Sequence, residues 1–336
     1  MAWSQDILDK LFDPNTYCVA FISHGKDSIA MLRAIQLLGL PLHGIVTSDV
    51  WATQDIPADL PEMWAWKKEA DQRILELYGV PVTHICATEK CSQNGNAERE
   101  RENNTGRCLR RLSFQDLFYK ELRNGRYVGT IKGFPLTLGG WCKKLKYEEI
   151  DFSKAILHQI EERRKRENMG FPFLTSWRMV PRFEAFSLSP QNEGQKINIV
   201  RYLGIAADEP KRIAKHIKKN DVVLPLVEIG WAEDLCGLIS KYQGLLSPTY
   251  ESATRDGCWF CPNQGVGQLR NLRHKHPDLW ALLLKWDADS PVTYHPDGHT
   301  VHDFDERFRL EDEGLIDPNE PFRWSMLTGN LQFRFF

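Results

Sequence analysis

The sequence predicts an α/β fold built on a doubly wound parallel sheet. Three apolar runs, at 17–22, 42–47 and 82–86, have the length of buried strands. Two segments with helical spacing, 26–38 and 63–78, separate these runs, and each ends at a glycine with a proline close behind. This alternation of strand and helix is typical of a parallel sheet with helices on both faces. Ligands of such sheets bind beyond the carboxyl ends of the strands.

Later segments extend the alternation. Residues 197–205 and 222–227 have strand character, with a helix expected between them at 207–217 and another at 231–242. The polar stretch 92–111 has Asn-Gly and Thr-Gly turn signals and no periodicity, so we expect a surface loop or lid there.

We place the domain boundary after residue 228. The sheet domain then comprises 1–228, including the polar loop and a helical or irregular insertion at 141–195. Residues 229–336, rich in Trp, Pro and His, form an appended C-terminal module that contains a Cys-x-x-Cys step.

Composition narrows the class of protein. The chain has 336 residues, of which 42% are hydrophobic and 26% charged, as expected for a globular protein with a substantial core. Its net charge of −2 gives no global sign of nucleic acid or of an anionic membrane as partner. No apolar stretch approaches the ~20 residues of a transmembrane helix, and no signal peptide is evident. Eight cysteines without a secretory signal favour reduced thiols or metal ligands, and hence a cytoplasmic protein.

The hexapeptide Ser-His-Gly-Lys-Asp-Ser, at 23–28, lies between the first strand and the first helix. A helix N-terminus carries unpaired N–H groups and the positive end of the helix dipole, so it attracts phosphate or sulfate. The glycine lets the backbone approach an anion, while the serines add hydroxyl donors and the lysine a cation. The spacing differs from a Walker A loop, which has four residues between its first Gly and Gly-Lys-Ser/Thr. The alternative is a chance glycine turn that caps the helix.

Three further segments carry residues suited to an anion or nucleotide. Asp49 ends the second strand, where it could equally cap a turn or helix. The segment 139–146, Gly-Gly-Trp-Cys-Lys-Lys-Leu-Lys, places glycines and lysines at a helix start, which could also be an ordinary basic helix start with a packed tryptophan. In the third segment, an Asp208-Glu209 pair follows a strand and precedes Arg212. This group can orient a cation or phosphate, unless Asp208 is only an N-cap.

Cys258 and Cys261 form the Cys-x-x-Cys step. The spacing places two thiolates on one side of a tight turn, as zinc or an iron–sulfur cluster requires. Zinc could be completed by His274 and His276, although their spacing is shorter than the usual finger pattern. Reduced thiols without metal are the third possibility.

Two other clusters are open to more than one interpretation. The basic stretches 99–111 and 270–276 could contact a nucleic-acid backbone, or carry local charge that neighbouring acids balance. A His- and Asp-rich stretch could hold a metal, but its Pro-Asp-Gly sequence at 296–298 favours turn residues. Its members are His295, Asp297, His299, His302, Asp303 and Asp305.

The hexapeptide resembles the pyrophosphate loop (PP-loop) of the ATP pyrophosphatases, which include the phosphoadenosine phosphosulfate (PAPS) reductases, tRNA thiolases and DNA phosphorothioation enzymes. Segment 139–146 is similar to the Trp-Cys-x-x-x-Leu-Lys segment of the PAPS reductase family, and 204–212 to its Gly-Ile-x-x-Asp-Glu-x-x-Arg segment. The likeness to phage and bacterial members covers roughly 17–263, in segments. Relatives usually have Gly at the position of His24, and often Arg at one or both of 206 and 207, which are alanines here.

The resemblance implies a Rossmann-like, adenine nucleotide alpha-hydrolase-like fold that binds ATP, or PAPS, with Mg²⁺. It also groups Cys142 and Cys236 with the Cys-x-x-Cys step as four ligands of a 4Fe–4S cluster, with Zn²⁺ as the alternative. Catalytic roles are expected for Lys26, Asp27 and Asp208. Nucleotide contacts are expected at Ser23, His24, Gly25, Lys26, Asp27, Ser28, Asp49, Gly140, Lys143, Lys146, Glu209 and Arg212.

Three activities are compatible with these residues. In the first, ATP is cleaved between its α- and β-phosphates, and a sulfur nucleophile displaces AMP from the adenylylated acceptor. In the second, a Cys thiolate reduces PAPS or adenylylsulfate to sulfite. The family's reductases carry a C-terminal Glu-Cys-Gly-Leu-His segment that is not found here, which favours ATP-dependent sulfur transfer. The third is a nucleotide-binding or DNA-associated module without turnover.

Overall fold

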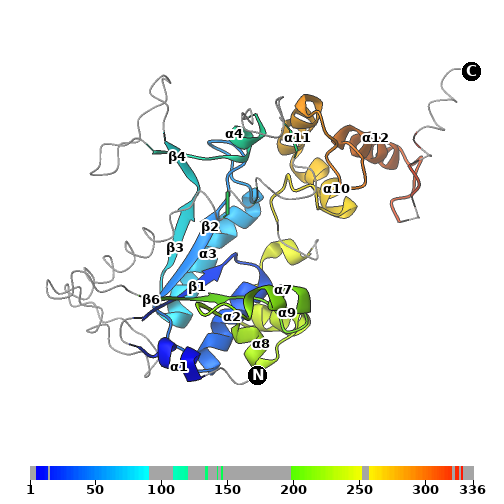
Figure 1. Ribbon diagram of the computed structural model, residues 1–336. Helices are drawn as coiled ribbons and strands as arrows, with labels where there is room; N and C mark the ends of the chain where they lie inside the picture. Colours follow the sequence, from blue (N-terminus) through cyan, green and yellow to red (C-terminus); the bar gives the residue numbers. More distant parts are fainter. Residues whose placement is uncertain are drawn as a thin grey trace, which may run out of the picture. The chain divides into compact units, whose positions relative to one another are not determined.

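The computed structural model describes 5–13, 16–90, 109–119, 133–134, 142, 145–146, 198–251, 257–319, 322–324 and 327. The chain divides into two compact units (Figure 1). The first consists of residues 1–49, 60–110 and 146–256, and the second of 50–59, 111–145 and 257–336.

The first unit is built on a five-stranded, all-parallel sheet with the order β3-β2-β1-β6-β7. The chain moves outward from β1 to β2 and β3 on one side, and from β6 to β7 on the other, so the order reverses between β1 and β6. This topology confirms the predicted Rossmann-like α/β class, and it makes the carboxyl ends of β1 and β6 the expected place for a ligand. The strands are β1 (Thr16–Ile22), β2 (Gly44–Asp49), β3 (Val82–Cys86), β6 (Asn198–Leu203) and β7 (Val222–Val223).

Helices flank this sheet (Figure 1). The long helix α3 ends at Gly79, which takes the left-handed conformation (φ 68°) common after a helix. A separate two-stranded sheet pairs β4 (Thr88–Lys90) with β5 (Leu109–Arg111), so the end of the predicted polar loop is a strand. The other elements are α1 (Gln5–Leu11), α2 (Lys26–Leu37), α3 (Pro61–Tyr78), α7 (Pro210–His216), α8 (Pro225–Ile229), α9 (Glu233–Tyr242) and the 3₁₀ helix η4 (Pro248–Glu251).

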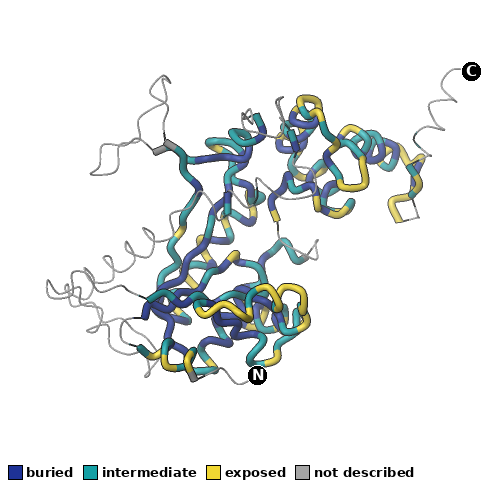
Figure 2. Tube along the Cα trace, viewed as in Figure 1, coloured by how far each residue is buried: buried dark blue, intermediate teal, exposed yellow. Residues whose placement is uncertain are grey.

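The core of this unit follows the alternation of β1. Cys18 and Ala20 are completely buried on the face that packs against α2 and α3, whereas Tyr17 and Val19 are buried on the opposite face. Ile213 of α7 packs into a third cluster. Figure 2 shows this buried interior in dark blue. Burial on both faces explains why β1 reads as a continuous apolar run.

The second unit has an aromatic core. The Trp259 and Trp286 rings stack with centroids 5.5 Å apart, and the Phe114 and Phe260 rings with centroids 4.4 Å apart. Trp259 also donates its backbone N–H to the carbonyl of Ala58, at 2.9 Å. The helices of this unit are α4 (Phe114–Phe118), α10 (Val266–Lys275), α11 (Pro277–Asp289) and α12 (Val301–Asp312).

A buried carboxylate ties α10 to α12. The Glu311 side chain is only 3% exposed and accepts from Arg270 Nε at 2.6 Å, from Arg270 Nη2 at 3.0 Å and from Arg307 Nε at 2.9 Å. Burial alone would raise the pKa of Glu311, but the two guanidinium groups lower it below its usual value.

The observed division differs from the predicted boundary at residue 228. Residues 229–256 belong to the sheet unit because α9 packs against α2, with Cys236 in the shared core and Ser240 Oγ donating to the Lys26 carbonyl at 2.8 Å. Residues 50–59 and 111–145, which the sequence assigned to the sheet domain, belong to the second unit. Nearly all of the predicted insertion at 141–195 lies outside the described residues. None of the helices in the described segments has both the length and the apolar character needed to cross a membrane.

Candidate functional site

The segment 23–28 forms a tight turn from the carboxyl end of β1 into α2. Its shape is fixed internally, because Ser28 Oγ donates to the Gly25 carbonyl at 2.9 Å and accepts from the Ser23 N–H at 3.2 Å. The Ser28 hydroxyl, predicted to contact an anion, therefore holds the turn together. His24 sits at φ 60°, in the left-handed region that residues other than glycine rarely adopt.

Backbone donors remain open at the start of α2. Gly25 is the N-cap, and no side chain caps the helix. Within the part of the chain that the structure describes, the N–H groups of His24, Gly25 and Asp27 have no hydrogen-bond acceptor, whereas that of Lys26 donates to Tyr250 Oη at 3.3 Å. Unpaired N–H groups at the positive end of a helix dipole are suited to an anion.

The neighbouring strand end lies directly against this turn. A Cβ atom placed on Gly204, just after β6, would come within 2.8 Å of Ser28 Cα and 2.9 Å of the Asp27 carbonyl oxygen. A residue with a side chain does not fit there without moving backbone. Gly204 therefore permits the close approach of β6 to the turn at the point where the strand order reverses.

Three carboxylates gather beside the open N–H groups. Oxygens of Asp27, Glu209 and Glu233 lie within 4.8 Å of one another, and Glu233 Oε2 is 2.7 Å from Lys26 Nζ. Burial, with repulsion from the other two carboxylates, raises the pKa of Asp27 to about 6 against the attraction of Lys26. Burial would lower the pKa of Lys26, but its bond to Glu233 raises it.

This acidic group fits Mg²⁺. The ion prefers oxygen ligands, usually one or two carboxylates together with water and phosphate oxygens. One oxygen of Asp27 is buried without a hydrogen-bond partner among the described residues, and a cation would satisfy it. Three carboxylates face Lys26 and Arg212, so one negative charge is left over that would repel a phosphate chain, and a divalent cation would remove that repulsion.

The segment after β6 organises this group. Glu209 accepts from Arg212 Nη1 at 2.6 and 2.7 Å and from the Ala206 N–H at 3.2 Å. Asp208 accepts from the Glu233 N–H at 3.2 Å, at the start of α9. Asp208 therefore helps to position α9, the helix that carries Glu233. The sequence had offered a capping role for Asp208 as the alternative to a catalytic one, but at the helix that directly follows it. Glu233 was not predicted from the sequence, because it lies 25 residues after Asp208, in an ordinary amphipathic helix.

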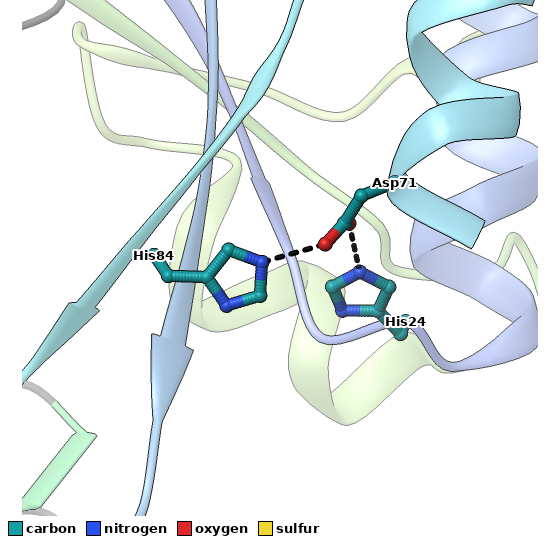
Figure 3. A group of neighbouring side chains, drawn as sticks. All are labelled: His24, Asp71 and His84. Carbon is teal, nitrogen blue, oxygen red and sulfur yellow. Dashed lines mark hydrogen bonds and ion pairs between the residues drawn. The ribbon is translucent and has the colours of Figure 1, made fainter. Parts of the chain in front are cut away.

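His24, Asp71 and His84 form a polar network (Figure 3), and Asp49 contacts His84. Asp71 of α3 accepts from His24 Nε2 and from His84 Nε2, each at 2.7 Å, and His84 Nδ1 lies 2.8 Å from Asp49 Oδ2. Lys67 Nζ is 3.8 Å from the other Asp49 oxygen. The Asp49 side chain, expected to contact nucleotide, is directed at His84 and Lys67. Neither Asp71 nor His84 lies in a motif that predicts a binding site.

The pKa values of the network residues are shifted in different directions. Burial lowers the pKa of His24, whose ring is completely buried. For His84, burial acts in the same direction, but the bonds to Asp49 and Asp71 raise its pKa to about 9. Burial would raise the pKa of Asp71, and the two histidines lower it.

The four predicted cysteine ligands are divided between the two units. Cys236 lies in the sheet unit, where burial raises the pKa of its thiol to about 12, whereas Cys142, Cys258 and Cys261 belong to the second unit. The Cys-x-x-Cys step does form a turn, with the Cys261 N–H donating to the Cys258 carbonyl at 2.9 Å. Gly140 and Lys143 lie outside the described residues.

The second basic stretch is occupied by internal ion pairs. Arg270 binds Glu311, Arg273 binds two aspartates of α12, and His274 shares one of these aspartates. These pairs neutralise the two arginines locally, as the balanced-charge alternative expects, and the zinc alternative that uses His274 stays a prediction. Most of the first basic stretch, up to residue 108, lies outside the described residues.

The His-rich stretch contains the predicted turn. The His295 N–H donates to the His299 carbonyl and the Gly298 N–H to the His295 carbonyl, both at 2.9 Å, and Gly298 has φ 86°. His302 Nδ1 lies 2.6 Å from Asp287 Oδ2. The stretch contributes no close group of metal-ligating atoms among the described residues.

Comparison with protein-family models, curated proteins and solved structures found no match.

Proposed function

We propose that the chain is a PP-loop enzyme that cleaves ATP between its α- and β-phosphates and couples the cleavage to sulfur transfer. The observation that carries this proposal is the set of open N–H groups at His24, Gly25 and Asp27, beside Lys26 at the start of α2. Their place at the reversal of the strand order, and the likeness of residues 23–28 to PP-loops, both support it.

The chain's own groups would act on the leaving pyrophosphate. The open amides and the N-terminus of α2 would hold its oxygens and stabilise the negative charge that develops as the bond breaks. Lys26, now paired with Glu233, would exchange that carboxylate for a phosphate oxygen. Asp27, Glu209 and Glu233 would hold Mg²⁺, which supplies charge neutralisation and aligns the phosphates when it is bound.

Sulfur transfer and the iron–sulfur cluster are proposed from the resemblance of residues 23–28, 139–146 and 204–212 to the PAPS reductase family. The required outcome of the reaction is displacement of AMP from the adenylylated acceptor by a sulfur nucleophile, with no step through a cluster.

The test is release of pyrophosphate from ATP and Mg²⁺ by the full-length chain, with candidate thiol acceptors. Lys26→Ala should abolish release, and Lys68→Ala, an exposed lysine on α3, should leave it unchanged. Sulfite formation from PAPS and a thiol donor is measured in parallel, because it identifies the competing reductase. Binding of ATP without any product would identify a non-catalytic module. Equal turnover by wild type and Lys26→Ala would contradict the proposed loop.

A further inference from the structure

A second group of metal-ligating side chains converges away from the three carboxylates. His24 comes from the turn after β1, Asp71 from α3 and His84 from β3, and Figure 3 shows them pointing toward one another. Their ligating atoms all lie within 4.8 Å of one another. We propose that His24, Asp71 and His84 bind a divalent transition-metal ion, with Zn²⁺ as the best match, in addition to the Mg²⁺ invoked for ATP cleavage.

The donor set selects the class of ion. Two imidazole nitrogens and one carboxylate suit Zn²⁺, and also Fe²⁺ and related ions, whereas Mg²⁺ and Ca²⁺ prefer all-oxygen sites. Three protein ligands with a position left over is the arrangement of zinc sites that also bind water or substrate. The acidic group at Asp27 offers oxygen alone, so the two groups should prefer different ions.

The spacing requires little movement. Zinc lies about 2.0–2.2 Å from nitrogen and oxygen ligands, so neighbouring ligands in a tetrahedral site are separated by roughly 3.3 Å. His24 Nε2 is 2.7 Å from Asp71 Oδ1, and His84 Nε2 is 2.7 Å from the other carboxylate oxygen, Oδ2. Each pair would open by about 0.6 Å, and the carboxylate would turn to bind the ion through one oxygen or both. His84 and Asp71 can move by that amount, because their side chains are 34% and 22% exposed, while the buried His24 stays fixed.

Asp49 supplies the outer partner that such a site needs. Metal-bound histidines almost always donate their other ring N–H to a carboxylate or carbonyl, which fixes the ring and the tautomer. His84 Nδ1 is 2.8 Å from Asp49 Oδ2, so its Nε2 is directed at Asp71. Lys67 lies 3.8 Å from the other oxygen of Asp49. The two carboxylates of Asp49 and Asp71 face the Lys67 ammonium and the His84 ring, so a metal ion bound here would take the place of the proton that His84 Nε2 shares with Asp71.

The proposed metal site adjoins the anion-binding turn, so a metal ion there could act on a bound anion. His24 is covalently adjacent to Gly25, whose N–H has no acceptor among the described residues, and the His84 side chain is 34% exposed to solvent, from which a fourth ligand could come. An ion held here would present a Lewis acid beside the anion-binding turn. Its fourth ligand would be water or an oxygen of a bound anion.

The competing interpretation is a network of charged hydrogen bonds that only holds the turn against α3. To separate the two, the full-length chain is treated with a chelator, desalted and titrated with Zn²⁺ by calorimetry without nucleotide. The expected result is one Zn²⁺ that is lost in Asp71→Asn and in His84→Gln. Asp49→Asn should weaken binding by about 10- to 100-fold, the usual effect of removing an outer partner.

Two controls isolate the site. Glu69→Gln removes an exposed carboxylate from the same helix and should leave Zn²⁺ binding unchanged. A Cys258→Ser/Cys261→Ser double variant removes thiolate-bound zinc and should also retain the proposed ion. The absorption spectrum of the Co²⁺-substituted wild type identifies the ligands without any variant. A site with nitrogen and oxygen ligands lacks the sulfur-to-cobalt charge-transfer absorption that a thiolate site shows.

The outcomes are decisive even if one variant does not fold. Circular dichroism of the metal-free variants shows which are folded, and the more exposed His84 gives the substitution best tolerated. Absence of Zn²⁺ binding by wild type, or wild-type binding by folded His84→Gln, would overturn the proposal. Because no nucleotide is present, this result is independent of pyrophosphate release.

Discussion

Replacing Gly204 with alanine tests the contact between the end of β6 and the anion-binding turn. The added Cβ would lie 2.8 Å from Ser28 Cα, with no flexible side chain to move aside. Carbon atoms pack comfortably at about 3.5 Å or more, so strand and helix must separate by roughly 0.7 Å. Overpacking of this kind costs about 1–3 kcal/mol. For a unit of this size, that corresponds to a fall in Tm of roughly 2–12 °C.

The same movement should weaken nucleotide binding, because the displaced backbone carries the open N–H groups. Loss of one charge-assisted hydrogen bond costs about 1.5–3 kcal/mol, which is a roughly tenfold or greater loss of ATP affinity. Calorimetric titration with ATP and thermal denaturation measure the two effects.

Gly267→Ala is the matched control for this substitution. Gly267 lies in α10, has no left-handed φ, and a Cβ there would meet no atom within 4 Å. Its Tm should stay the same or rise, since alanine favours a helix by up to about 1 kcal/mol over glycine. If Gly204→Ala matched the wild type in both Tm and ATP affinity, the close approach of β6 to the turn would be refuted, and the site with it.

Three further predictions concern charge and metal. Glu311→Ala should destabilise the second unit by about 3–5 kcal/mol, because two arginines lose a buried partner. The folded-state pKa of Glu311 is depressed, so the carboxylate stabilises the fold at neutral pH, and this stabilisation is lost as pH falls through that pKa. Acid denaturation should show the loss in wild type and not in Glu311→Ala. Asp27 has a folded-state pKa raised to about 6, so stability should fall as pH rises from about 4 to 6, and Asp27→Asn should flatten that slope in urea denaturation. Anaerobically purified wild type should contain iron and sulfide that Cys258→Ser removes, and a colourless wild type with stoichiometric zinc would exclude the cluster.

The sheet could be predicted because its strands are buried on both faces. The run at 17–22 is apolar throughout, since Tyr17 and Cys18 face opposite layers and both are covered. The turn at 23–28 was predictable for a similar local reason, because its glycine, serine and lysine stand together between a strand and a helix. In both cases the signal is contained within one short segment.

The network around Asp71 could not be predicted, because it depends on how α3 packs. Asp71 follows the core residue Ala70 on the border of the buried face of that helix, where an acid is unremarkable. His84 lies in the middle of β3, and nothing in its neighbours indicates an interaction with residue 71 or 24. Only the folded arrangement brings the three together.

Cys236 shows a different difficulty. Its role as a metal ligand comes from the family resemblance and stays a prediction. Its position on α9 places it in the core cluster shared with α2. The observed division differs from the predicted boundary at 228 because this face of α9 packs with the sheet unit.

His24 serves the backbone and the network at once, and this has a thermodynamic consequence. A residue with a side chain pays about 1–2 kcal/mol to adopt the left-handed conformation, and the bond to Asp71 helps to hold it there. The conformation of the turn and the hydrogen bonding of the network are therefore coupled through His24. Reciprocity then applies: if an anion on the turn alters the affinity of the histidines for a cation by some factor, the cation alters the affinity for the anion by that same factor.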